Sequence, residues 1–336
     1  MRHRLALLIL AFASSAVLAA PSPEATAKRS KADIEKTLKS IEATARASSP
    51  ASAAPPGATT APAGGGKKEK GTVTLTVTPS DLAKARGELA RLNGYRYLAG
   101  LNYDVQLKDE WNLTCKYAAH LCNVLGRIEH TPAKPAGMDD ATYKRGYEGT
   151  SHSNLFWTSG SDGLTGSVDG YMDDSDPGNV SRVGHRRWCL NPAMRHTGFG
   201  VVQGSSAMWS MDGAGGESSG AVVCFPSAGF HPLSYYKPGT AWCVSLDPGR
   251  YQVRTAQVKV YNLKSGGAAT RFPADVAGLA EAKLSDVRVD TSGIGITQCV
   301  IFRPEIKAIR GNRYGVVISG IEGMPGGKLA YTVEFF

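Results

Sequence analysis

The 336-residue sequence lacks several features that would assign a class of protein at once. Beyond its first twenty residues it has no apolar run of about 20 residues, the length that a membrane-spanning helix needs. It has no CxxC pair and no series of cysteines and histidines with the spacing of a structural zinc site. We therefore expect a protein that does not span a membrane and is not built around structural zinc.

A basic stripe is also missing, although the formal net charge is +9. Residues 20–71 carry nine basic and five acidic groups, and Arg2 and Arg4 lie in the N-terminal segment, so residues 72–336 carry only +3. Binding to nucleic acid requires basic residues concentrated on one face or along one helix. We therefore expect no nucleic-acid partner.

The first nineteen residues have the features of a secretory signal peptide. Arg2 and Arg4 form a basic start, an apolar run covers 5–12, and Val17-Leu18-Ala19 fits the small-residue cleavage pattern. A buried N-terminal helix is the alternative, but the order of these features favours a signal peptide over 1–19. The protein is therefore expected to be secreted, to an extracellular or periplasmic location.

Six cysteines fit an oxidising compartment, where disulfides form. They are Cys115, Cys122, Cys189, Cys224, Cys243 and Cys299. Cys115 and Cys122 are seven residues apart on a predicted helix, about 10.5 Å along its axis, which is too far for one disulfide. Disulfides are therefore predicted, and their pairing is left open.

Residues 20–79 are rich in Ala, Pro, Ser, Gly and Lys, a composition typical of a disordered low-complexity linker. Ile34, Leu38 and Ile41 recur at helical spacing, which predicts a transient amphipathic helix inside it. The segment is interpreted as a solvated tether, and attraction to an anionic wall or membrane surface is the alternative.

The following residues predict helices and then short strands. Ser80 is a candidate N-cap for a first helix, and a second helix is expected over 108–125 with Gly126 as its stop. The segments 180–188 and 198–209 alternate well enough to be strands. These elements are expected to form one domain over 80–218.

The C-terminal part, 219–336, has the pattern of a small all-β domain. Short segments with strand character are separated by turn-rich pieces such as Asp247-Pro248-Gly249. The predicted strands cover 241–246, 257–261, 299–302, 314–318 and 329–335. This number and spacing of strands favour a β-sandwich.

Five histidines fall between residues 120 and 196: His120, His130, His152, His185 and His196. His130 follows the second predicted helix and precedes Thr131-Pro132, so a loop could turn it into a cleft. His185 begins the run His185-Arg186-Arg187-Trp188, and His152 lies in a polar loop. We expect Arg186 and Arg187 to pair with Asp173, Asp174 or Asp176 rather than to bind phosphate.

Several of these segments together resemble the CAP superfamily of cysteine-rich secretory proteins, venom antigens and plant pathogenesis-related proteins. The matching segments, in chain order, are Leu92-Asn93-Gly94-Tyr95-Arg96, His130-Thr131-Pro132, Ser153-Asn154-Leu155, Gly184-His185-Arg186-Arg187-Trp188 and Gly198-Phe199-Gly200-Val201. The resemblance implies an α/β fold, a three-layer α-β-α sandwich, here followed by the small β-sandwich-like domain.

The family has an open cleft with two histidines and two acidic residues. By position these histidines are His130 and His185, and Asp174 matches one acid, with Asp173 as the near alternative. The other acid would be the Glu of a Gly-Glu-Asn-Leu motif, but that position is Ser153 here. His152, Ser153, Asn154 and Asp173 are expected to line the cleft.

Two readings of this cleft remain open. His130, His185 and Asp174 could hold zinc or another divalent metal, with a water in the fourth position. Alternatively, the histidines brace the cleft by hydrogen bonds. Serine is a poor general base near neutral pH, so the loss of the glutamate counts against a metal-assisted hydrolase.

The resemblance therefore favours a secreted, non-catalytic module that binds an extracellular ligand, lipid or protein, or a metal. A hydrolase of peptide or cell-wall substrates is one alternative. A structural protein that docks on a surface through its β domain is the other. The sequence leaves the oligomeric state open.

Overall fold

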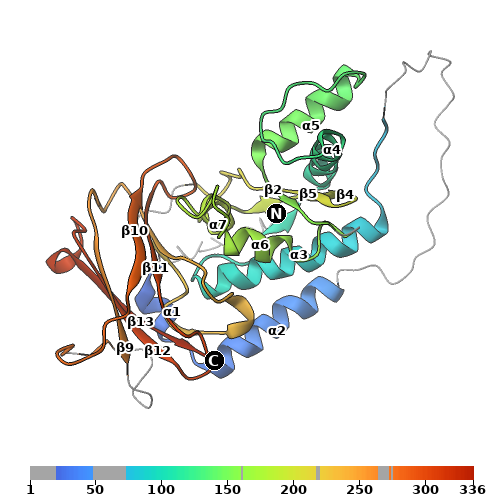
Figure 1. Cartoon of the computed structure of the whole chain (residues 1–336). Helices are drawn as coiled ribbons and strands as arrows, with labels where there is room; N and C mark the ends of the chain where they lie inside the picture. The colour runs from blue at the N-terminus through green and yellow to red at the C-terminus, as the bar shows by residue number, and fades with distance from the viewer. Residues whose placement is uncertain (1–19, 48–72, 160–161, 217–219, 264–271, 274) are drawn as a thin grey trace, which may run out of the picture.

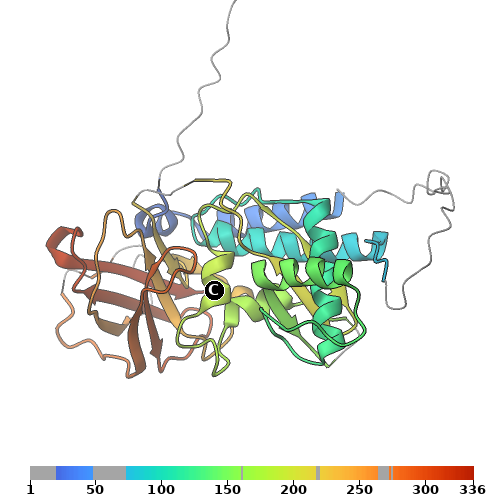
Figure 2. The same cartoon turned by 90° about the horizontal axis from the view of Figure 1, so that it is seen from above.

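The computed structural model describes residues 20–47, 73–159, 162–216, 220–263, 272–273 and 275–336. The molecule has a helical half and a β half, which lie side by side (Figures 1 and 2). The predicted signal peptide, 1–19, and residues 48–72 of the predicted linker lie outside the described residues.

The helical half is built on α3 (Pro79–Leu98), which begins at Thr78 rather than at the expected Ser80. The Thr78 hydroxyl accepts a hydrogen bond from the Asp81 backbone N–H, and the Asp81 carboxylate accepts one from the Thr78 backbone N–H. This reciprocal cap satisfies two N–H groups that would otherwise lack a partner. Pro79 fits the first turn because that position needs no N–H donor.

A three-stranded antiparallel sheet lies at the centre of the helical half. Its strands have the order β2 (Ser153–Trp157), β5 (Ser205–Trp209), β4 (Phe199–Val202). One face is covered by α4 (Asp109–Leu125) and α5 (Asp140–His152), and the other by α3 and α6 (Ser167–Asp173) (Figure 1). These layers confirm the predicted α-β-α arrangement.

The α4 helix approaches the sheet closely because β4 offers it a glycine. A Cβ atom added to Gly200 would lie 2.0 Å from the backbone nitrogen of Lys116 in α4. No side chain fits at that distance, so Gly200 fixes the spacing between helix and sheet.

The prediction of a strand over 180–188 is wrong. Those residues form a turn followed by the short helix α7 (Gly184–Cys189). The segment was read as a strand because its arginines were counted as exposed polar residues. Arg186 and Arg187 are in fact buried. After α7, β3 (His196–Thr197) pairs in parallel with β1 (Gln106–Leu107).

The β half consists of two four-stranded sheets. The first has the order β10 (Leu284–Asp290), β11 (Gln298–Pro304), β8 (Trp242–Leu246), β6 (Val222–Phe225). The second has the order β7 (Gly229–His231), β13 (Lys328–Phe335), β12 (Arg313–Ser319), β9 (Gln257–Leu263). The fully buried Trp242 of the first sheet contacts Tyr314 and Phe335 of the second, so the core lies between them. This confirms the predicted β domain.

Two consecutive arginines of α7 hold the two halves together. The Arg186 guanidinium is fully buried and donates hydrogen bonds to the carbonyls of Met172 and Asp173 in α6 and of Ala241 beside β8. Arg187 forms an ion pair with Asp290 at the end of β10. The expectation that both arginines pair with neighbouring aspartates is therefore wrong. The Arg186 side chain bonds to backbone carbonyls, and Arg187 pairs with an aspartate of the β half.

The N-terminal part of the predicted linker is ordered instead. The helix α1 (Pro23–Ala27) packs beside β7 and β13, and α2 (Lys31–Ala47) runs along α3 (Figure 1). Ile34 and Leu38, two of the three residues noted for helical spacing, are buried against the body. The prediction of disorder over this segment fails because a neighbouring surface covers the apolar face of α2.

The predicted disulfides are not found. All six cysteines are free thiols buried in the protein interior.

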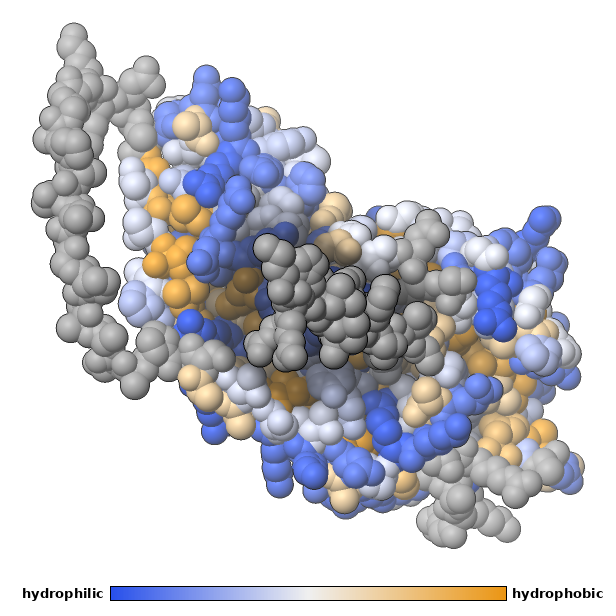
Figure 3. All heavy atoms as spheres, turned by 180° about the vertical axis from the view of Figure 1, so that it is seen from behind, coloured by the Kyte–Doolittle hydropathy of each residue, from blue (hydrophilic) through white to orange (hydrophobic). Residues whose placement is uncertain are grey.

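No helix of the described residues is long and apolar enough to cross a membrane. Seen from behind, apolar surface residues form separate patches among hydrophilic ones (Figure 3).

Candidate functional site

His130 reaches the site from the turn that follows α4. Gly126 ends the helix in the left-handed conformation, with φ of 67°, as predicted for a C-terminal glycine. Four residues later, Nδ1 of His130 lies 2.9 Å from the carbonyl oxygen of Thr150 near the end of α5. A carbonyl can only accept, so Nδ1 carries the proton and Nε2 keeps its lone pair in the neutral ring.

His185 reaches the same site from the first turn of α7. Its Nδ1 lies 2.9 Å from Oδ1 of Asp174, whose side chain is completely buried. Asp174 itself takes the left-handed conformation, with φ of 48°, at the end of α6. Its other oxygen, Oδ2, accepts a hydrogen bond from the backbone N–H of Arg186. The carboxylate thus fixes the ring of His185 through Nδ1 and leaves Nε2 unused.

The rings of His130 and His185 are neighbours, with centroids 6.4 Å apart and planes inclined by 39°. The resemblance implied this proximity across 55 residues of sequence. Desolvation is the main cause that lowers the pKa of His130, and the nearby His185 and Arg182 lower it further. His130 is therefore neutral over a wider pH range than an ordinary histidine.

Asn154 of β2 supports the pair from behind. Its side-chain amide donates to the backbone carbonyl of His185 at 3.0 Å, and its backbone carbonyl accepts from the Tyr171 hydroxyl at 3.1 Å. The Tyr171 ring also contacts His185, with centroids 5.6 Å apart. Asn154 therefore lies beside the histidine pair and positions His185.

Three of the predicted lining residues lie elsewhere. His152 stacks on Trp209, with centroids 5.0 Å apart. The Ser153 hydroxyl is buried 3.6 Å from Sγ of Cys115, because alternate residues of β2 face opposite sides of the sheet. Asp173 forms an ion pair with Lys237 and a hydrogen bond with Thr240 in the β half. These expectations are corrected accordingly.

The prediction of Asp174 as a direct metal ligand is also corrected. Both of its oxygens are engaged, one by His185 and one by the Arg186 backbone. Within the described residues, no group of three or more His, Cys, Asp or Glu side chains is arranged to hold a metal ion. The chain itself supplies two nitrogen donors here, fewer than the three protein ligands usual in a zinc site with one open position.

Sequence reasoning missed the groups that orient the rings. Thr150 acts through its backbone carbonyl, which no motif marks. Tyr171 lies in α6, and only its position three residues before the candidate acid Asp174 could have drawn attention to it. The partners of Arg186 and Arg187 in the β half, Ala241 and Asp290, could not be predicted because they lie more than fifty residues away along the chain.

The geometry is therefore that of an α-β-α domain with two anchored imidazoles at its surface. Residues 89–212 match the model of the cysteine-rich secretory protein family, CAP. The chain therefore contains a CAP domain over these residues, which confirms the resemblance seen in the sequence. Searches of the curated proteins and of the solved structures gave no match.

Proposed function

We propose that the protein is an exported binding protein that holds its ligand at His130 and His185 and carries out no hydrolysis there. The supporting observation is the anchoring of both rings. Each ring uses Nδ1 on an internal acceptor, the Thr150 carbonyl or the Asp174 carboxylate, and has Nε2 left for a ligand. A fixed ring loses little rotational freedom on binding, which favours affinity.

The acidic groups of the site count against a hydrolase. A general base must accept a proton from the attacking water within hydrogen-bond distance. The Asp174 carboxylate is buried and holds His185, while Ser153, at the family's glutamate position, contacts Cys115. With these two groups engaged elsewhere, binding is the better supported activity.

A divalent metal such as zinc is part of this proposal. Metal-binding histidines characteristically donate their second ring N–H to a carboxylate or a backbone carbonyl, which fixes the tautomer. His185 and His130 have one partner of each kind. The two Nε2 atoms would supply half of a tetrahedral set, and water or the incoming ligand would complete it.

Calorimetric titration of the exported chain with zinc tests the site. We expect zinc to bind to the wild type and not to the His130→Ala/His185→Ala double variant. His120→Ala is the matched control, because His120 lies on the same helix that leads to His130. Equal zinc binding by the wild type and the double variant would exclude the metal site.

A second experiment separates binding from hydrolysis. The chain is incubated with a peptide library and with purified cell-wall polymer, with and without zinc. We expect no products beyond those formed by the double variant. Release that depends on His130 and His185 would show a hydrolase and overturn the proposal.

A further inference from the structure

The strand β10 lies at the edge of the first sheet of the β half, with β11 as its neighbour on one side (Figure 1). Alternate backbone N–H and C=O groups of an edge strand point away from its neighbour, where they can pair with a further strand. Apart from the ladder with β11, no backbone hydrogen bond joins β10 to another described residue. Its outer edge is therefore open to a strand from another chain.

An exposed apolar side chain lies at the middle of this edge. Val287 is paired with the fully buried Phe302 of β11, yet it is itself 38% exposed. Two residues on, Val289 points to the same side of the sheet and is packed against the core. A strand added beside β10 would cover Val287 and remove apolar surface from water.

The charges of β10 are arranged symmetrically about Val287. Asp286 and Arg288 flank it on the opposite face of the strand and form an ion pair whose side chains are both partly exposed. If two copies of β10 pair antiparallel with Val287 opposite Val287, Asp286 of each copy lies opposite Arg288 of the other. Charges on an edge strand commonly repel an incoming strand. Here the same charges attract a second copy.

The charges also select one register. A two-fold pairing centred one residue to either side places Asp286 opposite Asp286 or Arg288 opposite Arg288, and like charges directly opposite each other are destabilising. A parallel pairing in register brings both kinds of like-charge contact together. The bulge of β10 lies between Leu284 and Asp286, so the strand is regular over 286–290, where the second copy would pair.

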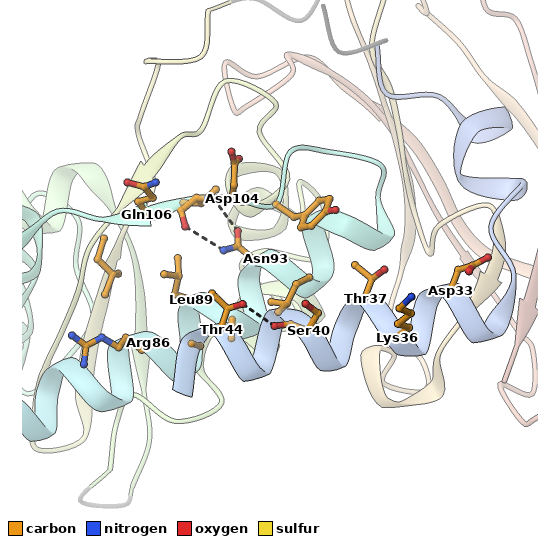
Figure 4. A pocket seen from close by; sticks show the side chains of 16 residues that line it. Asp33, Lys36, Thr37, Ser40, Thr44, Arg86, Leu89, Asn93, Asp104 and Gln106 are labelled. Carbon is orange, nitrogen blue, oxygen red and sulfur yellow. Dashed lines mark hydrogen bonds between the residues drawn. The ribbon is translucent and has the colours of Figure 1, made fainter. Parts of the chain in front are cut away.

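A groove between α2, α3 and residues 103–107 shows the contrast (Figure 4). Its lining includes Asp33 and Asp104 as well as Lys36 and Arg86. Charges of both signs are mixed there and define no occupant. The charges of β10 define one, because they complement their own copy.

We propose that two copies of the protein associate through β10 into a two-fold dimer, in which their first sheets join into one continuous sheet. The contact is the same patch on both copies, as two-fold symmetry requires, and the pairing is centred on Val287. A single strand of seven residues on each copy makes a small interface. The dimer is therefore weak, with a dissociation constant on the order of micromolar or above.

Analytical ultracentrifugation of the exported chain over a range of concentrations tests the proposal. We expect the wild type to dimerise as its concentration rises. Arg288→Asp and Asp286→Arg should each weaken association at least about tenfold, because either change puts like charges opposite each other at two positions. Lys259→Asp is the control, since Lys259 lies on another edge strand, β9, in an exposed ion pair with Glu281. A wild type that stays monomeric, or wild-type association in either β10 variant, would overturn the proposal.

A mixture of the two variants tests the register. One variant carries two arginines beside Val287 and the other carries two aspartates, so an equimolar mixture of Asp286→Arg and Arg288→Asp should form a heterodimer although neither dimerises alone. A variant whose β10 has unfolded would not be rescued by mixing. A mixture that stays monomeric would refute pairing centred on Val287.

Hydrogen exchange of the wild type gives a measurement that needs no variant. Amides of β10 should exchange more slowly as the protein concentration rises, while those of β9 stay unchanged. Exchange in β10 that is independent of concentration would contradict the dimer. The His130→Ala/His185→Ala variant is expected to dimerise like the wild type, which separates this test from that of the proposed function.

Discussion

Oδ1 of Asp174 lies 2.9 Å from Nδ1 of His185, while Oδ2 of the same carboxylate accepts a hydrogen bond from the backbone N–H of Arg186. One completely buried carboxylate therefore orients the imidazole of the site and the turn of α7 that carries the interface arginine. The site and the contact between the two halves share this group.

The first prediction concerns Asp174→Asn. Asparagine tolerates the left-handed backbone at this position, so the fold is retained while the charge on the partner of His185 is lost. Loss of such a supporting carboxylate lowers metal affinity by about 10–100-fold. Zinc calorimetry measures this, with Asp176→Asn as the control at an exposed position. Wild-type affinity in Asp174→Asn would contradict the orienting role.

The second prediction concerns Arg186→Leu. The change leaves the carbonyls of Met172, Asp173 and Ala241 without their buried donor. The free energy of unfolding should fall by about 3 kcal/mol or more, because each unsatisfied buried acceptor costs about 1–3 kcal/mol. Urea unfolding measures the loss. Arg127→Leu, in an exposed surface pair with Glu129, should change it by less than about 1 kcal/mol. A decrease in the free energy of unfolding of Arg186→Leu as small as that of Arg127→Leu would show that Arg186 is dispensable for stability.

The third prediction concerns Ile34→Ala, at a buried position in the N-terminal half of α2. Truncation of a buried isoleucine to alanine costs about 2–5 kcal/mol, and here the cost falls on the docking of one helix. Hydrogen exchange of the α2 amides should therefore become faster while β12 stays protected. Glu35→Ala, at the exposed neighbouring position, should leave exchange unchanged. Normal protection of α2 in Ile34→Ala would argue against docking through this face.

The fourth prediction concerns the pH dependence of stability. Burial lowers the pKa of His231 to about 4, and its Nδ1 accepts a hydrogen bond from the Ser227 backbone. Between pH 6.5 and pH 4 the unfolded chain binds a proton that the folded chain excludes, so stability falls as the pH falls through this window. We expect His231 to contribute on the order of 3 kcal/mol to this loss, because one pKa unit corresponds to about 1.4 kcal/mol.

Urea unfolding of the wild type and of His231→Gln at pH 7 and pH 4 checks this value. The loss of stability on acidification should be smaller in the variant by about 3 kcal/mol. The same loss in both proteins would mean that His231 is not held neutral by the fold.

The sequence was sufficient to predict the elements that form by local rules. The α4 helix ends at Gly126, and the alternating segments near the C-terminus form β8, β9, β11, β12 and β13. The proximity of His130 and His185 followed from motifs whose order is shared with a family. In each case the signal lies within a few residues or within a recognisable pattern.

The remaining features depend on partners that are remote in sequence. The apolar spacing of α2 was visible, but only its contact with α3 and the body keeps the helix folded. The arginines of α7 looked like surface residues because their partners, Ala241 and Asp290, lie in the β half. Ser153 turned away from the histidines because the register of β2 points it toward α4.

The central claim is that His130 and His185 act as one site through their Nε2 atoms. Ring-nitrogen NMR of the histidine-labelled chain, recorded during titration with zinc, tests it most directly. We predict that the Nε2 signals of both rings shift together at the same zinc concentration, while each Nδ1 stays protonated. Shifts confined to one ring, or to other histidines such as His120 or His196, would contradict the claim.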